Sequence, residues 1–125
     1  MQGIQSVNGD VAIKLFNCGK ADKNDIITEI FKSKMVLVGS STINKGILSG
    51  AAGLLEIIKG LGFKNKKAAA FGSYGWSGES VGLITEELKK AGMEVVNDGI
   101  RVLWNPDETS LEQCVAFGKD IGGRI

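Results

Sequence analysis

The chain has 125 residues, of which 43% are hydrophobic and 23% are charged, and its formal net charge is +1. This length and balance fit one soluble globular domain and exclude two domains. Basic and acidic residues are interspersed, and the one short basic cluster, residues 64–67, is typical of a solvated turn. The sequence therefore lacks the basic patch of a nucleic-acid-binding protein.

Histidine is absent, and the two cysteines, Cys18 and Cys114, lie outside any CxxC pattern. The lack of histidine excludes histidine-based acid–base catalysis and argues against a catalytic zinc or iron site. Reduced, packed thiols are the rule for proteins of the cytosol. Because no apolar run reaches membrane-spanning length and residues 1–4 do not resemble a signal peptide, we expect a cytoplasmic protein.

The first half of the chain alternates short apolar runs with helical patterns. Residues 1–9 resemble the end of a helix followed by a turn, and no strand precedes them. Residues 11–16 predict an edge strand, and residues 22–31 predict a capped amphipathic helix. Residues 35–38 are apolar on both faces, as in a central parallel strand, and residues 39–42 then predict a loop.

The second half continues this alternation. We expect a helix at about residues 49–59, a strand at residues 68–71 and a helix that ends at Gly92. Residues 100–104 predict the last strand, and residues 109–112 form a capping box for a final helix. Strand and helix repeated four times predict an α/β protein with a mostly parallel sheet between two layers of helices.

Ligands of such open sheets bind beyond the carboxyl ends of the strands. Three predicted loops meet at that edge, at residues 17–20, 39–46 and 72–79. The second loop is rich in short hydrogen-bonding side chains, which form turns more often than they contact ligands. The third loop is the most informative of the three.

In the third loop, two aromatic residues, Tyr74 and Trp76, stand among glycines that let a ligand approach the main chain. Such rings hold planar ligands by stacking and apolar contact. A helix beginning near Ser77 would favour an electron-rich or anionic group at its start. The alternative, in which both rings only pack on neighbouring helices, stays open.

Other ligand-binding classes do not fit these loops. Neither the GxGxxG fingerprint of dinucleotide-binding folds nor the GxxxxGK[ST] motif of P-loop proteins occurs. A receiver domain needs carboxylates at its strand ends to hold a cation. The strand ends of this chain instead carry Asn17, Ser40, Ser73 and Asn105.

Two motifs, Val-Gly-Ser-Ser-Thr-Ile-Asn at residues 38–44 and Phe-Gly-Ser-Tyr-Gly-Trp-Ser-Gly at residues 71–78, resemble the flavodoxin-like domain of flavodiiron proteins (A-type flavoproteins). The resemblance continues through residues 24–27 and 60–63 and covers nearly the whole chain. It implies a flavodoxin-like fold in one domain, residues 1–125, that binds FMN non-covalently. It also implies a flavoprotein that relays electrons from a reductant to a di-iron centre, where oxygen or nitric oxide is reduced.

The resemblance places the flavin ring between residues 40–46 and residues 73–79. The positions that it implies as cofactor-binding are Ser40, Thr42, Asn44, Gly46, Ser73, Tyr74, Gly75, Trp76 and Gly78. No residue of the chain is a convincing general base or nucleophile, so we name no catalytic residue and no metal ligand.

The chain also departs from the family pattern. Ser41 stands where the family usually has proline, and the di-iron domain is absent, so we do not expect oxygen or nitric oxide chemistry from this chain alone. The family's first strand and its phosphate loop are missing at the N-terminus, which would weaken FMN binding. Without that strand, residues 11–16 lack their usual neighbour in the sheet. We expect one of three outcomes: a gap in the sheet closed by rearrangement, a homodimer that fills the gap, or marginal stability.

Two functions from different classes follow. The first is an FMN-binding electron-transfer module that works with a redox partner protein or a di-iron domain. The second is a flavin-free truncated remnant that acts as an interaction or assembly domain. Saturable flavin binding by the purified chain would separate them.

Overall fold

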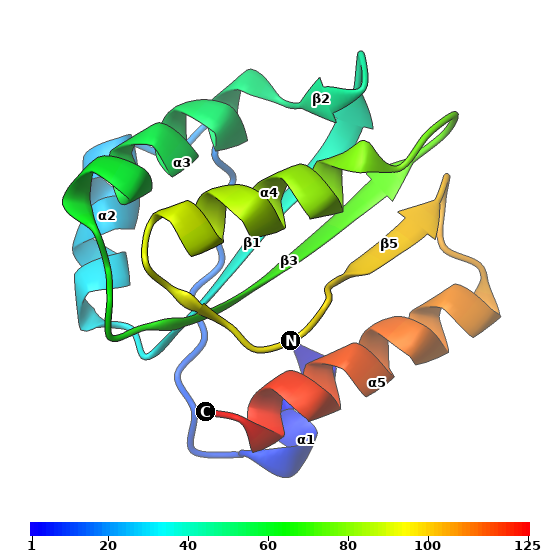
Figure 1. The fold of residues 1–125 in the computed structure, drawn as a ribbon. Helices are drawn as coiled ribbons and strands as arrows, with labels where there is room; N and C mark the ends of the chain where they lie inside the picture. Colours follow the sequence, from blue (N-terminus) through cyan, green and yellow to red (C-terminus); the bar gives the residue numbers. More distant parts are fainter.

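A computed structural model describes residues 1–125 as a sheet between two layers of helices (Figure 1). One face of the sheet is covered by α2 (Lys23–Lys32), α3 (Ser49–Leu61) and α4 (Glu79–Lys90). The other face is covered by α1 (Gln2–Val7) and α5 (Glu108–Gly123). The predicted α/β/α fold is therefore confirmed, and none of these helices has the length and apolar character that a membrane span requires.

The sheet is mostly parallel and has the order β2-β1-β3-β4, with β5 also paired to β3. Its strands are β1 (Met35–Ile43), β2 (Gly46–Ile47), β3 (Lys67–Tyr74), β4 (Glu94–Val95) and β5 (Ile100–Leu103). β3 is the central strand. On one side it pairs in parallel with β1; on its other side its first residues pair in parallel with β4 and its later residues with β5. Only β2 is antiparallel, as a hairpin with β1. The carboxyl ends of β1, β3 and β5 therefore meet at one edge of the sheet.

The main core lies between the sheet and α2, α3 and α4. Alternate residues of β1 and β3, Val36 and Val38 beside Ala68 and Ala70, face this layer. The alanines leave room for α4 to lie close to the sheet, as the small side chains of that strand predict. Three side chains at the centre of this layer are completely buried: Ile58, Ile84 and Leu88.

On the opposite face, α1 packs closely against α5 through glycines. A Cβ atom on Gly118 would lie 3.1 Å from the Gly3 Cα atom, and one on Gly3 would overlap the Val115 carbonyl oxygen. This close packing buries a small cluster of Ile4, Ala69 and Ile121. The first and last helices of the chain are therefore held together, which positions both of them on the sheet.

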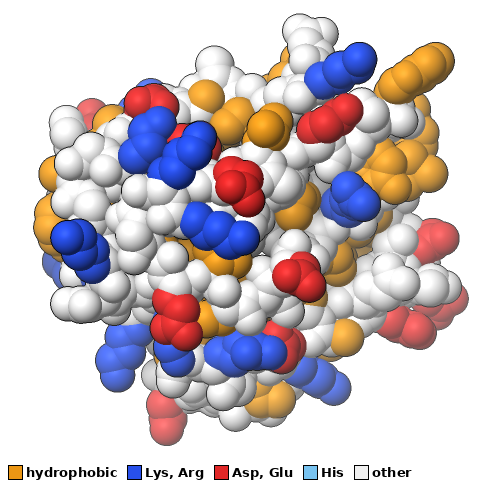
Figure 2. Space-filling view, in the orientation of Figure 1, with side chains coloured by type: hydrophobic (Ala, Val, Ile, Leu, Met, Phe, Trp, Pro, Cys, Tyr) orange, Lys and Arg blue, Asp and Glu red, His pale blue; other side chains and the backbone are white.

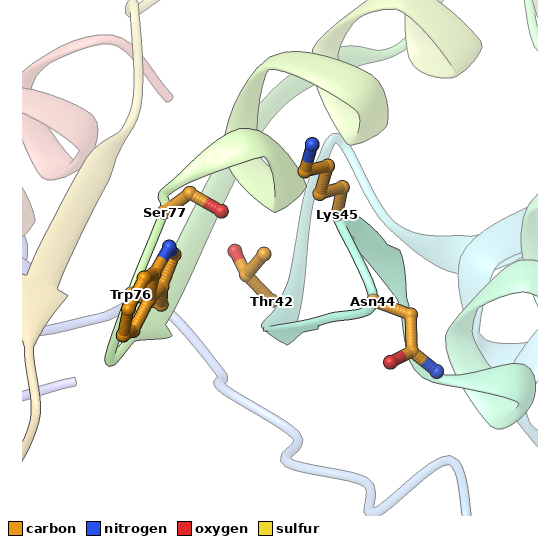
Figure 3. Close-up of a pocket in the computed structure, with 5 residues that line it drawn as sticks. All are labelled: Thr42, Asn44, Lys45, Trp76 and Ser77. Atoms are coloured by element: carbon orange, nitrogen blue, oxygen red, sulfur yellow. The ribbon is translucent and has the colours of Figure 1, made fainter.

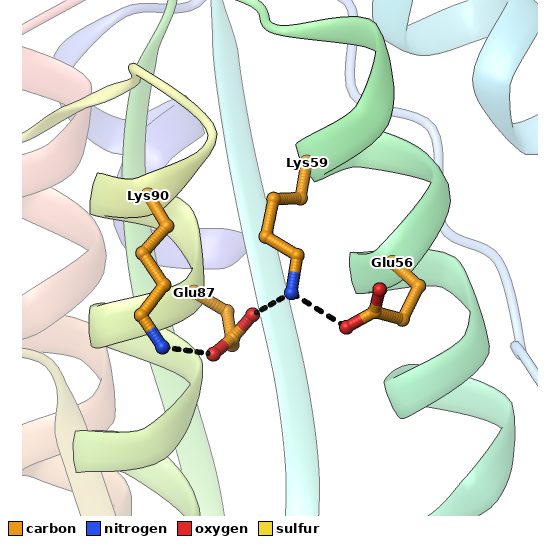
Figure 4. Close-up of polar contacts among 4 residues, drawn as sticks. All are labelled: Glu56, Lys59, Glu87 and Lys90. Atoms are coloured by element: carbon orange, nitrogen blue, oxygen red, sulfur yellow. Dashed lines mark hydrogen bonds and ion pairs between the residues drawn. The ribbon is translucent and has the colours of Figure 1, made fainter.

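A chain of ion pairs joins α3 to α4 (Figure 4) on the outer surface, where acidic and basic side chains lie interspersed (Figure 2). The Lys59 Nζ atom lies 2.6 Å from Glu56 Oε1 and 2.8 Å from Glu87 Oε2, and Lys90 Nζ lies 2.8 Å from Glu87 Oε1. Hydrogen bonds from Lys59 and Lys90 lower the pKa of Glu87. Glu87 is thus the shared carboxylate of this network.

Residues 11–16 do not form the predicted edge strand. Their side chains do alternate, since Val11 and Ile13 pack toward α1 and α5 whereas Phe16 packs toward the main core. However, no backbone hydrogen bond joins residues 12–16 to another part of the chain. A strand requires a paired neighbour. On its side away from β3, β1 pairs with β2 through Thr42 and Ile43 and not with residues 11–16. A gap closed by rearrangement, one of the three expected outcomes, is therefore not seen as strand pairing of this segment.

Several element boundaries also differ from the prediction. β1 and β3 continue through Ile43 and Tyr74, into the segments predicted to be loops, because each strand pairs with its neighbours over that length. The last helix begins at Glu108, before the predicted capping box, because Asp107 caps it by accepting a hydrogen bond of 2.8 Å from the Ser110 N–H group. The two-residue strands β2 and β4 were not predicted.

Candidate functional site

A tight hairpin forms one side of the candidate site. Its two central residues, Asn44 and Lys45, have φ angles of 49° and 58°, and the flanking residues Ile43 and Gly46 are paired. Positive φ at both central positions is characteristic of a two-residue type I′ hairpin. Figure 3 shows the side chains of Asn44 and Lys45 leaving the turn in different directions.

The loop between β3 and α4, residues 75–78, forms the other side. Hydrogen bonds join the first turn of α4, directly after this loop, to β1: the Ser80 N–H group donates to Thr42 Oγ1 and the Ser80 hydroxyl to the Ser40 carbonyl oxygen, both at 3.1 Å. Gly72 permits this approach, because a Cβ atom there would overlap the Ser40 carbonyl oxygen. The two sides of the site are therefore held at a fixed separation.

A cavity of about 200 Å³ opens between these two segments (Figure 3). It is lined by Thr42, Asn44, Lys45, Trp76 and Ser77. The indole of Trp76 stands at one side, and the hydroxyls of Thr42 and Ser77 point into the space between. The Trp76 side chain is 98% exposed, so a flat ligand could lie against it without displacing any packed group.

Three of the predicted site residues, Thr42, Asn44 and Trp76, line this cavity. The prediction did not include Lys45 and Ser77, although both lie inside the predicted loops. A lysine in a turn and a serine before a helix are too common to stand out in one sequence. The hairpin and the β3–α4 loop bring them to the same cavity.

The remaining predicted residues lie beside the cavity rather than in its lining. Ser40 is buried, and its hydroxyl accepts a hydrogen bond from the Leu48 N–H group and donates one to the Ser41 carbonyl. The Ser73 hydroxyl lies 2.8 Å from that of Ser41 on the neighbouring strand. Four further positions flank the cavity in the hairpin or the β3–α4 segment: Gly46, Tyr74, Gly75 and Gly78.

Glu79, in the first turn of α4, places a negative charge next to the cavity. The Ser77 hydroxyl and the backbone N–H of Glu79 lower the pKa of its carboxyl group, and Lys45 and Arg101 contribute in the same direction. Its Oε2 atom is buried without a hydrogen-bond partner. An anionic carboxylate therefore already occupies the start of α4, where the sequence suggested attraction for an anionic ligand group.

The arrangement suits a planar heterocycle with polar edges. It offers one exposed aromatic face, two hydroxyls, an amide and a lysine within one cavity. Lys45 is the only charged residue among the five that line the cavity. No group of three or more Cys, Asp or Glu side chains lies together in a way that could hold a metal ion.

The chain is similar in sequence to known proteins over most of its length. The profile of the family described as Flavodoxin matches residues 6–118. Curated relatives include the anaerobic nitric oxide reductase flavorubredoxins of Klebsiella pneumoniae and Salmonella typhi, which are 48% and 47% identical over 120 residues. These matches cover 96% of this chain but only 25% of each relative, so the chain spans a quarter of the length of these curated relatives.

Solved structures give the same picture. The rubredoxin oxygen:oxidoreductase of Desulfovibrio gigas aligns with a TM-score of 0.89 and 34% identity, over 98% of this chain and 31% of that one. The flavodiiron protein of Giardia intestinalis aligns with a TM-score of 0.90 and 29% identity, over 98% and 30%. A flavodoxin from the domain Archaea aligns with a TM-score of 0.83 and 30% identity, over 98% of this chain and 82% of that one.

Proposed function

The chain belongs to the flavodoxin family and is related to the flavodoxin-like domain of flavodiiron proteins, and on that premise we propose that it binds FMN in the cavity between Thr42 and Trp76. Domains of this kind are FMN-binding electron-transfer modules. The observation that carries the proposal is the cavity itself, because residues from both family motifs line it.

Each lining residue has a role that follows from its chemistry. The Trp76 indole would lie against one face of the flavin ring, and the Thr42 hydroxyl and Asn44 amide would hydrogen-bond to its polar edge. The Lys45 ammonium would stabilise negative charge on that edge. Bound FMN supplies the one- and two-electron redox chemistry, whereas the chain binds, orients and shields the ring.

Binding through the ring alone should be weaker than binding through ring and phosphate. Charge-assisted hydrogen bonds to phosphate are among the stronger polar contacts, and Lys45 is the only positively charged residue that lines the cavity. The carboxylate of Glu79 at the start of α4 adds repulsion for an anion nearby. We therefore expect micromolar rather than tighter affinity for FMN.

A fluorescence titration tests this proposal. FMN is titrated with the purified chain, and quenching of flavin emission is followed to saturation. Trp76→Ala should weaken binding by about tenfold, because it removes the stacking surface. Leu111→Ala is a matched control, since Leu111 is also a large exposed side chain but lies on α5, away from the cavity. Absence of quenching at hundreds of micromolar would reject FMN binding by this chain.

For the electron acceptor, we propose a di-iron domain or a separate redox partner protein. The similarity to flavodiiron proteins and to a nitric oxide reductase flavorubredoxin supports this choice. If the chain binds no flavin, the alternative of an interaction or assembly domain takes its place. Size-exclusion chromatography would then test the homodimer that the free edge of β1 suggests.

A further inference from the structure

Trp104, the residue after β5, has an unusual backbone conformation. Its φ angle is 53°, in the left-handed region that bulky residues rarely adopt. Its side chain is 72% exposed, so burial of the indole does not compensate for this strain. A strained residue persists where surrounding contacts hold it, and such residues cluster at functional sites.

Two contacts hold Trp104 against the β3–α4 segment. Its N–H group donates a hydrogen bond of 2.8 Å to the Tyr74 carbonyl oxygen. Its indole lies on the backbone of Gly75, where an added Cβ atom would be 2.7 Å from Cη2 and 2.8 Å from Cζ2 of the ring. A glycine at position 75 is therefore required for this packing.

A residue of β5 holds the other end of the same loop. The Arg101 guanidinium donates a hydrogen bond of 3.1 Å to the Gly78 carbonyl oxygen. Trp104 and Arg101 thus contact the loop at Gly75 and at Gly78, on either side of Trp76. Because the Trp76 side chain is 98% exposed, its direction depends on the backbone that these contacts fix.

We propose that Trp104 is a positioning residue of the ligand site. It does not line the cavity, but by packing on Gly75 it fixes the backbone that presents Trp76 to the ligand. The part of this inference that concerns the ligand rests on the proposed function. The part that concerns the loop can be measured without any ligand.

The test uses the full chain with Trp104→Ala, Trp104→Phe and Leu103→Ala, the last being a matched control because Leu103 is also exposed and adjacent. Without ligand, the NMR order parameters of the backbone N–H groups of residues 75–78 should fall in Trp104→Ala and stay near the wild-type values in the other two variants. With FMN, Trp104→Ala should raise the Kd about fivefold through loss of preorganisation. It should also reduce the visible circular dichroism of the bound flavin, and Trp104→Phe should restore both.

Each outcome is decisive. Unchanged order parameters in residues 75–78 of Trp104→Ala overturn the proposal, as does an unchanged Kd for FMN. If the wild-type chain binds no FMN, the proposed function fails, while the order parameters still test the positioning of the loop. If Trp104→Ala does not fold, Gly75→Ala replaces it, because the added methyl group displaces the indole while Trp104 is retained.

Discussion

Ile84 has no exposed surface, whereas its neighbour on α4, Leu83, is 42% exposed. Ile84→Ala should therefore lower the free energy of unfolding by about 2–5 kcal/mol, because it leaves a cavity in the main core. Leu83→Ala, the matched control, should cost less than about 1 kcal/mol. Urea unfolding of both variants measures the difference. Equal losses would show that α4 does not present Ile84 to the core.

A residue of the site could be identified from the sequence where its immediate neighbours in the chain mark it out. Trp76 stands out because an aromatic residue between glycines is unusual in a core, and it lines the cavity. The burial of Ser40 was not predictable, because it depends on contacts with Leu48 and Ser80 far along the chain. Trp104 was read only as the end of a strand, since its packing on Gly75 arises from the pairing of β5 with β3.

At the scale of elements, α1 and α5 can pack closely because glycines, which have no side chain, lie where the two helices meet. Gly3→Ala should lower the free energy of unfolding by about 1–3 kcal/mol, because the new methyl group would push against the backbone of α5. Gly123→Ala is the control, since Gly123 is also a helical glycine, at the end of α5, but a Cβ atom there meets nothing within 4 Å. It should be neutral or stabilise by up to about 1 kcal/mol. Thermal unfolding measures both, and equal effects would contradict this packing.

The stability that the ion pairs between α3 and α4 provide should depend on pH. Because Lys59 and Lys90 lower the pKa of Glu87, its carboxylate stabilises the folded chain at neutral pH. That contribution is lost as the pH falls through the lowered pKa. Glu87→Gln should thus cost about 1 kcal/mol or less at pH 7 and nothing in strong acid. Glu86→Gln, whose partner Lys89 lies at 3.8 Å on the same helix, is the control, and an equal pH dependence in both would contradict the prediction.

The elements were predictable where one local pattern sufficed. The helices predicted at about residues 49–59 and ending at Gly92 correspond to α3 and α4, and Gly62 and Gly92 have positive φ just after them. Phe31, in the predicted helix of residues 22–31, is 60% exposed, because a helical pattern alone does not report which face meets the sheet. The pattern of residues 11–16 is that of a strand, but a strand also needs a neighbour, and no local pattern reports whether one is present. The same limit applies to β1 and β3, whose length is determined by pairing with each other.

At the scale of the whole molecule, backbone amides should differ in their protection from hydrogen exchange. Backbone amides of residues 12–16 have no hydrogen-bonded partner in the chain, whereas Ala68, Ala69 and Ala70 are fully buried in the central strand. Amide hydrogen exchange should therefore be fast in residues 12–16 and slow in β3. Equal protection of the two segments would indicate that another strand, for example from a second copy, pairs with residues 12–16.

The glycine contact between α1 and α5 also affects the order in which the molecule can be made. α1 packs mainly on α5, and Gly3 meets backbone near Gly118, more than a hundred residues later. During synthesis, α1 therefore cannot find its place before α5 has left the ribosome. The α2–α3–α4 layer can form earlier on the growing chain, so α1 and α5 dock against each other after that layer has formed.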